Sequence, residues 1–201
     1  MIEQPEPVLL KATELSDSDI GSCEWDSVHN CELLTVSNNG ETIQWGPKKS
    51  EYKGKYRPVW VPASTRLHLH SGKFQWDFIV EEMAAGQIGI GFMLLWNVGP
   101  DWGFFGYLGA SSTAWSYDPS TGDVVCDTLS IQGSLPQFGD GHTGIVSVRL
   151  ELPRRDEGSA SFTVNRVDTQ PIPLPEGAVV LPAACLLKET QRVTLARFQR
   201  S

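Results

Sequence analysis

The sequence lacks the features that mark membrane-spanning and exported proteins. No apolar run approaches the roughly 18 residues of a membrane helix, and no Asn-x-Ser/Thr sequon occurs. The first ten residues, MIEQPEPVLL, are acidic and interrupted by proline, whereas a signal peptide begins basic and continues apolar. We therefore expect an intracellular, cytoplasmic protein that does not associate with membranes.

Basic residues and metal-ligand patterns are scarce as well. The 201 residues include 16 Lys or Arg against 24 Asp or Glu, a formal net charge of -8, so the chain as a whole lacks the basic excess that binds nucleic acid. The four cysteines form no Cys-x-x-Cys pair. His68 and His70 would share one face of a strand, but two histidines do not complete a metal site. We expect free buried thiols, no metal and no cofactor.

Helical periodicity is nearly absent, and turn residues are frequent. Only residues 8–20 run more than a few positions without a helix breaker. Elsewhere short segments rich in β-branched and aromatic residues alternate with Gly, Pro, Asn, Asp and Ser, a pattern typical of an antiparallel sandwich. We predict an all-β protein. Residues 1–24 would form an N-terminal extension with at most a short helix, and residues 25–201 one two-sheet β-sandwich domain.

Three segments predict strands by their side-chain pattern. In KFQWDFIVEE, residues 73–82, Phe74, Trp76, Phe78 and Val80 fall on one face. GIVSVRLEL, residues 144–152, repeats this alternation, and residues 160–165 are its expected hairpin partner. In GQIGIGFMLLW, residues 86–96, alternating glycines predict a central strand packed closely against a backbone or a large ring.

Three glycine-containing stretches predict turns. Asn38, Asn39 and Gly40 separate two strand-like segments, and Asn-Gly is the strongest short hairpin signal. The segment 118–123, DPSTGD, resembles a calcium loop, but its proline and the lack of a twelfth-position glutamate favour a tight turn. The segment 139–144 matches G-x-G-x-x-G, yet a strand follows it where a nucleotide site requires a helix.

Five motifs in this order resemble those of SPRY domains, bent antiparallel β-sandwiches that many intracellular proteins use to hold a partner. Residues 31–45 also resemble the PRY-type hairpin that precedes that domain, so the resemblance covers roughly residues 25 to 200. Arg166 departs from the family, because it stands where a turn glycine is expected. The motifs are Ser71–Asp77 (SGKFQWD), Gly89–Phe92 (GIGF), Trp115–Asp118 (WSYD) with Gly122, Phe162–Asn165 (FTVN), and Leu181–Ala183 (LPA) with Val193 and Phe198.

The resemblance implies a monomeric, non-enzymatic protein-interaction module whose end loops form a shallow pocket for a short peptide or protein segment. Such a module would serve as a substrate-recognition or scaffold part of a larger assembly. Carried over to this chain, the pocket draws on the loop after Trp45, the WNVGPDWGFF loop and the turn after Leu186. The candidate partner-binding residues are Trp102, Phe104, Phe105, Tyr52, Tyr56, Arg57, Leu187, Lys188 and Glu189. Lys188 stands where some members have a tryptophan.

The composition of two loops supports binding independently of the family. Residues 96–107 interleave Trp102, Phe104, Phe105 and Tyr107 with glycine and proline, which places large rings on a loop, where they either anchor a partner or cap the core. Residues 46–58, GPKKSEYKGKYRP, form the only local basic cluster, which either steers an acidic partner or is simply solvated.

Two other functions remain as alternatives. The seven tryptophans suit a lectin-like carbohydrate-binding domain, in which rings stack on sugars, although the absence of export signals argues against it. A hydrolase is the second alternative, but the sequence has no Gly-x-Ser-x-Gly elbow, and Glu81 and Glu82 point to opposite faces of a strand.

Overall fold

The computed structural model describes residues 23–26, 34–46, 60–81, 88–95, 107–110, 112–133, 135–138, 143–187 and 191–200. Within these residues the regular structure is β, apart from two 3-10 turns, η3 (Asn38–Gly40) and η5 (Leu108–Ala110), which confirms the all-β prediction. In this part of the chain no helix has the length and apolarity needed to cross a bilayer. Residues 1–22 of the expected N-terminal extension lie outside the described ranges.

The larger of two sheets has eight strands in the order β1-β2-β14-β4-β9-β10-β11, with β12 also paired to β10. All of its pairings are antiparallel. The strands are β1 (Leu34–Ser37), β2 (Thr42–Trp45), β4 (Gly72–Glu81), β9 (Gly144–Leu152), β10 (Gly158–Val164), β11 (Val167–Asp168), β12 (Ile172–Leu174) and β14 (Arg192–Arg200).

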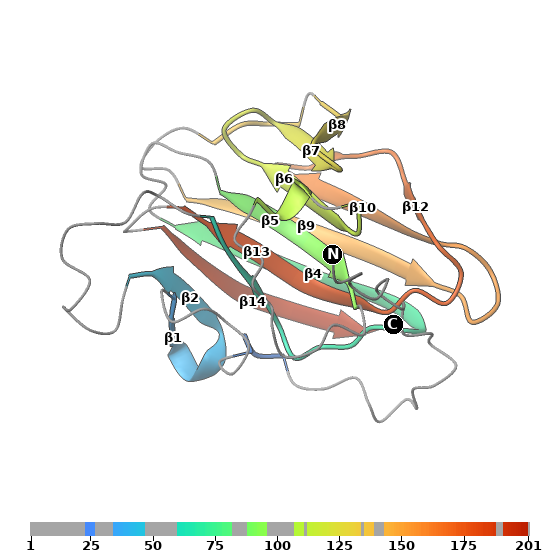
Figure 1. Ribbon diagram of the computed structural model, residues 1–201, viewed down its shortest axis with the longest axis horizontal. Helices are drawn as coiled ribbons and strands as arrows, with labels where there is room; N and C mark the ends of the chain where they lie inside the picture. Colours follow the sequence, from blue (N-terminus) through green and yellow to red (C-terminus); the bar gives the residue numbers. More distant parts are fainter. Residues whose placement is uncertain are drawn as a thin grey trace, which may run out of the picture.

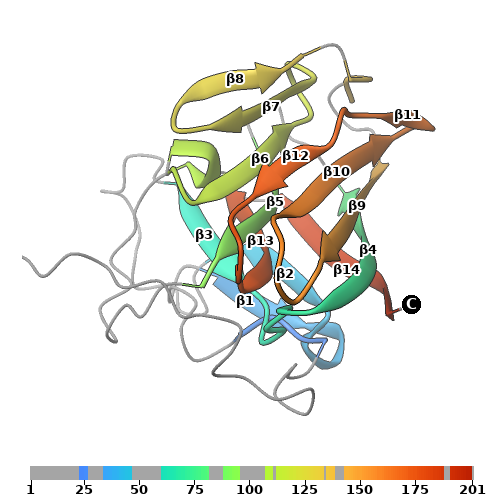
Figure 2. The same ribbon diagram turned by 90° about the vertical axis from the view of Figure 1, so that its right-hand side faces the viewer.

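The smaller sheet has six antiparallel strands in the order β3-β13-β5-β6-β7-β8. Figures 1 and 2 show the two sheets as the facing layers of a sandwich. The strands are β3 (Val61–Ser64), β5 (Gly89–Leu94), β6 (Ala114–Asp118), β7 (Asp123–Cys126), β8 (Leu129–Gln132) and β13 (Val180–Leu186).

The core lies between the sheets and is built by side-chain alternation. Along β4 buried and partly exposed residues alternate, so Phe74, Trp76, Phe78 and Val80 face inward as predicted. Strand β9 shows the same alternation. Phe92 of β5 bridges the layers, because its ring stacks on Phe162 of the larger sheet at 5.8 Å between centroids. Burying this many large apolar side chains is the main source of the fold's stability.

The glycines of β5 allow the close approach that the sequence predicted. A Cβ atom on Gly91 would lie 2.0 Å from the backbone oxygen of Trp115 on β6, nearer than any real side chain is found. The prediction that β5 is a central strand is confirmed, because β5 lies between β13 and β6 in the smaller sheet.

The predicted hairpins β1-β2 and β9-β10 are both present. The turn of the first has positive φ at Asn38, Asn39 and Gly40, as the Asn-Gly signal indicated. The turn at 118–123 is also confirmed, since the Asp118 carbonyl accepts the Gly122 N–H at 2.8 Å and its carboxylate accepts the Ser120 N–H at 2.9 Å.

One strand prediction is wrong. Residues 67–70 were expected to form a strand with His68 and His70 on one face, but β3 ends at Ser64 and this segment pairs only through an isolated bridge between Leu69 and Val180. Leu67 and Leu69 are buried, and so is His70 at 4% exposure, so the spacing of the leucines reflects burial rather than a continued strand.

Candidate functional site

Most of the predicted partner-binding residues belong to loops outside the described ranges. These are Trp102, Phe104, Phe105, Tyr52, Tyr56, Arg57, Lys188 and Glu189. Leu187 is described, and it is partly exposed directly after β13. The residues from which each loop departs and to which it returns are described, so the ends of each loop can be placed on the sandwich.

The loop that contains Tyr52, Tyr56 and Arg57 leaves the larger sheet and returns to the smaller one. It departs after Trp45, whose N–H donates to the Gln191 carbonyl at 3.2 Å. It returns at Trp60, immediately before β3. Val61 pairs with Leu186 in the β3-β13 register. Trp60 directly precedes Val61 and Leu187 directly follows Leu186, so both residues lie at the same end of the sheet.

Gln191 holds the two ends of the Lys188–Thr190 loop together. Its side chain is fully buried at 0% exposure, and its Oε1 accepts the Leu187 N–H at 2.7 Å. Its backbone carbonyl also receives the Trp45 N–H, so one residue ties the starts of two predicted binding loops. A buried amide that is hydrogen-bonded in this way fixes the positions of the strands that it joins.

The aromatic loop 96–106 begins and ends at opposite ends of the smaller sheet. Leu95 donates its N–H to Val179 at 2.8 Å, at the end where Leu94 pairs with Val180. At the other end, the Leu108 N–H donates to Sγ of Cys185 at 3.3 Å. The ring of Tyr107 meets Trp60 edge-on at 4.8 Å between centroids, next to the return of the first loop.

Tyr107 and Trp60 belong to a second apolar cluster on the outer face of the smaller sheet. Its buried members are Leu108, Ala114, Ala183 and Cys185, and Trp60, Met93 and Tyr107 pack against them. Desolvation raises the pKa of the Tyr107 hydroxyl well above its ordinary value, and the nearby Cys185 thiol adds to the effect. The ring of Tyr107 therefore caps the sheet, as one of the two interpretations of this loop expected.

The described residues offer little for catalysis or metal binding. No group of three or more His, Cys, Asp or Glu side chains among them is placed to hold a metal ion. Burial raises the pKa of the Cys185 thiol to about 12 and also raises the pKa of Cys23 and Cys126, which opposes formation of the reactive thiolate.

Three residues of this end were not anticipated from the sequence. Trp60 and Gln191 organise the loop ends, and the buried indole Nε1 of Trp45 has no hydrogen-bond acceptor among the described residues. Trp60 could have been noticed because it follows the basic, tyrosine-containing loop. Gln191 gives no local signal, since a glutamine in a polar turn is ordinarily exposed.

Known structures of the same architecture identify the fold. The chain is similar to the SPRY domain of human HERC1, at 18% identity and TM-score 0.58, over 86% of this chain and 96% of that domain. The chain has the SPRY fold. A second human SPRY domain matches at 14% identity and TM-score 0.58, over 81% of this chain and 94% of that one. The TRIM65 PSpry domain matches at 13% identity and TM-score 0.55, over 87% and 88%. No protein-family model and no curated protein sequence matches this chain.

The five motifs that suggested a SPRY domain lie on the strands that form the centre of the sandwich. They fall on β4, β5, β6, β10 and β13. Arg166, the departure from the expected turn glycine, takes the conformation that a glycine would take, with φ 68° next to Asn165 at φ 48°. The SPRY turn is therefore kept although its usual residue is missing.

Proposed function

We propose that this SPRY fold is a non-enzymatic interaction module that binds a short peptide or protein segment through the loops at one end of the sandwich. Its role would be the substrate-recognition or scaffold part of a larger assembly. The observation that carries this proposal is the convergence of loop ends: Trp45, Trp60, Tyr107 and Leu187 are joined by the hydrogen bonds of Gln191, the β3-β13 register and the Trp60-Tyr107 contact.

The frame beneath these loop ends is suited to a preformed site. The six-stranded sheet is covered on both faces near Tyr107, by the main core on one side and by the second apolar cluster on the other. A double-covered sheet holds the described ends of these loops in place before a ligand binds, which removes part of the ordering cost of binding. Large aromatic side chains such as Trp102 and Phe104 supply much contact area for few rotatable bonds, which is why they anchor interfaces.

A peptide array and a glycan array, probed side by side with the purified chain, test the class of ligand. The proposal expects saturable peptide hits. Tight glycan binding without any peptide hit would instead support the lectin-like alternative.

Two double variants then test the loop. Trp102→Ala with Phe104→Ala should weaken the best peptide at least about thirtyfold, since truncating hot-spot aromatics costs about 2 kcal/mol or more. The matched control is Leu129→Ala with Ile131→Ala, which removes two large apolar side chains that are 65% and 45% exposed on β8. The control should bind normally.

The thermal stability of the same variants separates binding from folding. Trp102→Ala with Phe104→Ala should melt at nearly the wild-type temperature. By contrast, Trp76→Ala empties a fully buried core position and should lower the unfolding free energy by roughly 3 to 5 kcal/mol. If the loop variant also lost roughly 3 to 5 kcal/mol of unfolding free energy, its rings would pack inside the domain.

A further inference from the structure

A hollow lies on the outer face of the larger sheet, away from the loop ends. Its volume is about 470 Å³, and a second hollow of about 350 Å³ shares Lys73 and Glu151 with it. We call the two together the polar groove. It lies where β4 begins at Gly72, whereas the loops converge where β4 ends at Glu81, whose side chain pairs with Arg192 beside Gln191.

The floor of the polar groove is a straight row of side chains across four strands. The registers pair Gln199 of β14 with Gln75 of β4, Gln75 with Arg149 of β9, and Arg149 with Ser161 of β10. Directly opposed residues of antiparallel strands project from the same face, so these four side chains point outward together. A second row runs beside it through Lys73, Glu151 and Ser159.

The lining of the polar groove is basic in a chain that is acidic. The first hollow is lined by Lys73, Arg149 and Glu151, and the second, at the strand ends, adds Arg154 and Arg200. With Asp168, which contacts Arg149, four cations stand against two acids in a chain whose net charge is -8. A local positive field of this kind attracts anionic ligands and steers their approach.

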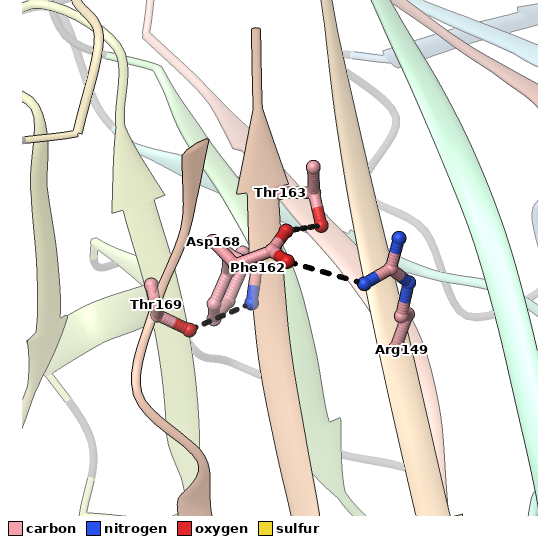
Figure 3. Close-up of polar contacts among 5 residues, drawn as sticks. All are labelled: Arg149, Phe162, Thr163, Asp168 and Thr169. Carbon is pink, nitrogen blue, oxygen red and sulfur yellow. Dashed lines mark hydrogen bonds and ion pairs between the residues drawn. The ribbon is translucent and has the colours of Figure 1, made fainter. Parts of the chain in front are cut away.

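Arg149 is held in place by the strand at the sheet edge, as Figure 3 shows. Its Nη1 lies 3.4 Å from Oδ2 of Asp168 on β11, and the other carboxylate oxygen of Asp168 accepts the Thr163 hydroxyl at 2.5 Å. The hydrogen bond from the Phe162 N–H to Oγ1 of Thr169 fixes the same edge at 2.9 Å. The guanidinium is therefore oriented beside the row, while half of its side chain remains exposed at 52%.

The neutral side chains of the polar groove are not committed to other partners. Gln75, Gln199, Ser159 and Ser161 make no side-chain hydrogen bond within the described residues. The Lys73-Glu151 pair, at 2.8 Å, has side chains that are 63% and 56% exposed. Such exposed pairs contribute little to stability, so Lys73 can exchange Glu151 for a ligand carboxylate at small cost.

We propose that the polar groove binds an extended acidic segment of a partner polypeptide. Four strands at ~4.8 Å spacing give a floor of about 14 Å, the length of about four residues of extended chain. Glutamine side chains both donate and accept, which matches a peptide backbone, and Arg149 and Lys73 match carboxylates. A glycan fits less well, because Phe74, the aromatic residue in the lining, is 3% exposed and has no free ring face on which a sugar could stack.

Fluorescence polarisation with the full chain tests this assignment. The probe is a fluorescein-labelled octapeptide of alternating glutamate and serine, and the control probe has glutamine in place of glutamate. The acidic probe should bind saturably and more weakly as salt rises, and the glutamine probe should not bind. Lys73→Glu with Arg149→Glu should weaken the acidic probe at least about tenfold.

A matched charge reversal separates the polar groove from the basic loop 46–58. Lys53→Glu with Lys55→Glu changes the net charge equally, and it should leave the affinity for the acidic probe within about twofold of wild type. The groove variant should melt only slightly below wild type, because the two ion pairs that it replaces with like charges, Lys73-Glu151 and Arg149-Asp168, are exposed and contribute little to stability.

Several results would overturn the assignment. Equal weakening by both charge reversals would indicate non-specific attraction, and weakening by the loop variant alone would place acidic segments at the loops. Failure of the acidic probe to bind, or groove-dependent binding of a sulfated oligosaccharide in its place, would remove the acidic peptide as the occupant. None of these results bears on the peptides that depend on Trp102 and Phe104.

Discussion

At the scale of single residues, several non-glycine residues hold left-handed backbone conformations in tight hairpin turns, and two of them, Arg166 and Thr128, are neither Asn nor Asp. Arg166 has φ 68° in the two-residue turn between β10 and β11, and Thr128 has φ 62° in the turn between β7 and β8. Two-residue hairpins favour such turns because their twist matches that of the strands. The left-handed conformation costs a residue with a Cβ about 1 to 2 kcal/mol.

We therefore expect Arg166→Gly to raise the free energy of unfolding by about 0.5 to 1 kcal/mol, because glycine relieves the left-handed cost but gains freedom in the unfolded chain. Urea denaturation measures the change. The control is Arg155→Gly in the β9-β10 connection, where φ is not positive, and it should be neutral or destabilising. If the two substitutions had equal effects, backbone strain would not be the cause.

At the scale of elements, the 3-10 turn η5 closes an apolar layer that contains two ionisable groups. The Tyr107 hydroxyl accepts a hydrogen bond from Ser116 at 3.3 Å, and Cys185 lies fully buried beneath Leu108. Burial raises the pKa of Cys185 from 9.0 to about 12 and raises the pKa of Tyr107 above its ordinary value of 10.0. Both groups therefore stay neutral in the folded protein at pH values where the unfolded chain ionises.

This layer predicts a loss of stability in alkaline solution. Above about pH 9 the unfolded state binds fewer protons than the folded state. The contribution of these two groups to the unfolding free energy is therefore complete below that pH and decreases as the pH rises. Tyr107→Phe removes one of the groups, so its destabilisation relative to wild type should shrink above pH 10. Denaturant titrations at pH 7, 9, 10 and 11 measure this difference, and a constant difference would contradict a buried neutral Tyr107.

The elements also show how far sequence reasoning reaches. The face that β4 turns to the core follows from the alternation of Phe74, Trp76 and Phe78, and the β1-β2 turn follows from Asn39 and Gly40. Alternation reveals a face but not a partner strand, because pairing depends on residues far away in the chain. The β13 and β14 segments flank one short turn, yet they belong to different sheets. The row through Gln199, Gln75, Arg149 and Ser161 could not be predicted for the same reason.

At the scale of the whole molecule, the polar groove and the loop ends around Gln191 lie at opposite ends of one strand. Strand β4 has 10 residues, so its ends are about 30 Å apart at ~3.3 Å per residue. The polar groove lies on the outer face of the larger sheet at the Gly72 end. The loops converge at the Glu81 end, where the smaller sheet contributes Trp60 and Leu187. The loop ends at Trp60 and Leu187 are therefore separated from the polar groove by the length of β4, whereas Leu95, from which the aromatic loop departs, lies at the other end, where Leu94 pairs with Val180.

We expect the two ligands to bind independently. A loop-dependent peptide at saturation should change the affinity of the acidic probe less than about twofold, because a coupling free energy requires an element that both ligands shift. Isothermal titration calorimetry of each ligand, with and without the other, measures this coupling. Strong competition would mean that the two ligands share one site.

The position of β14 governs how the molecule can be assembled during synthesis. β14 is the last described strand in the chain, but it lies inside the larger sheet, between β2 and β4. In the same way β13 joins β3 to β5 in the smaller sheet. Until β14 leaves the ribosome, β2 and β4 lack the strand that joins them, and until β13 does so, β3 and β5 lack theirs. The nascent chain therefore exposes unpaired strand edges until β13 and β14 have been synthesised, and both sheets are completed only then.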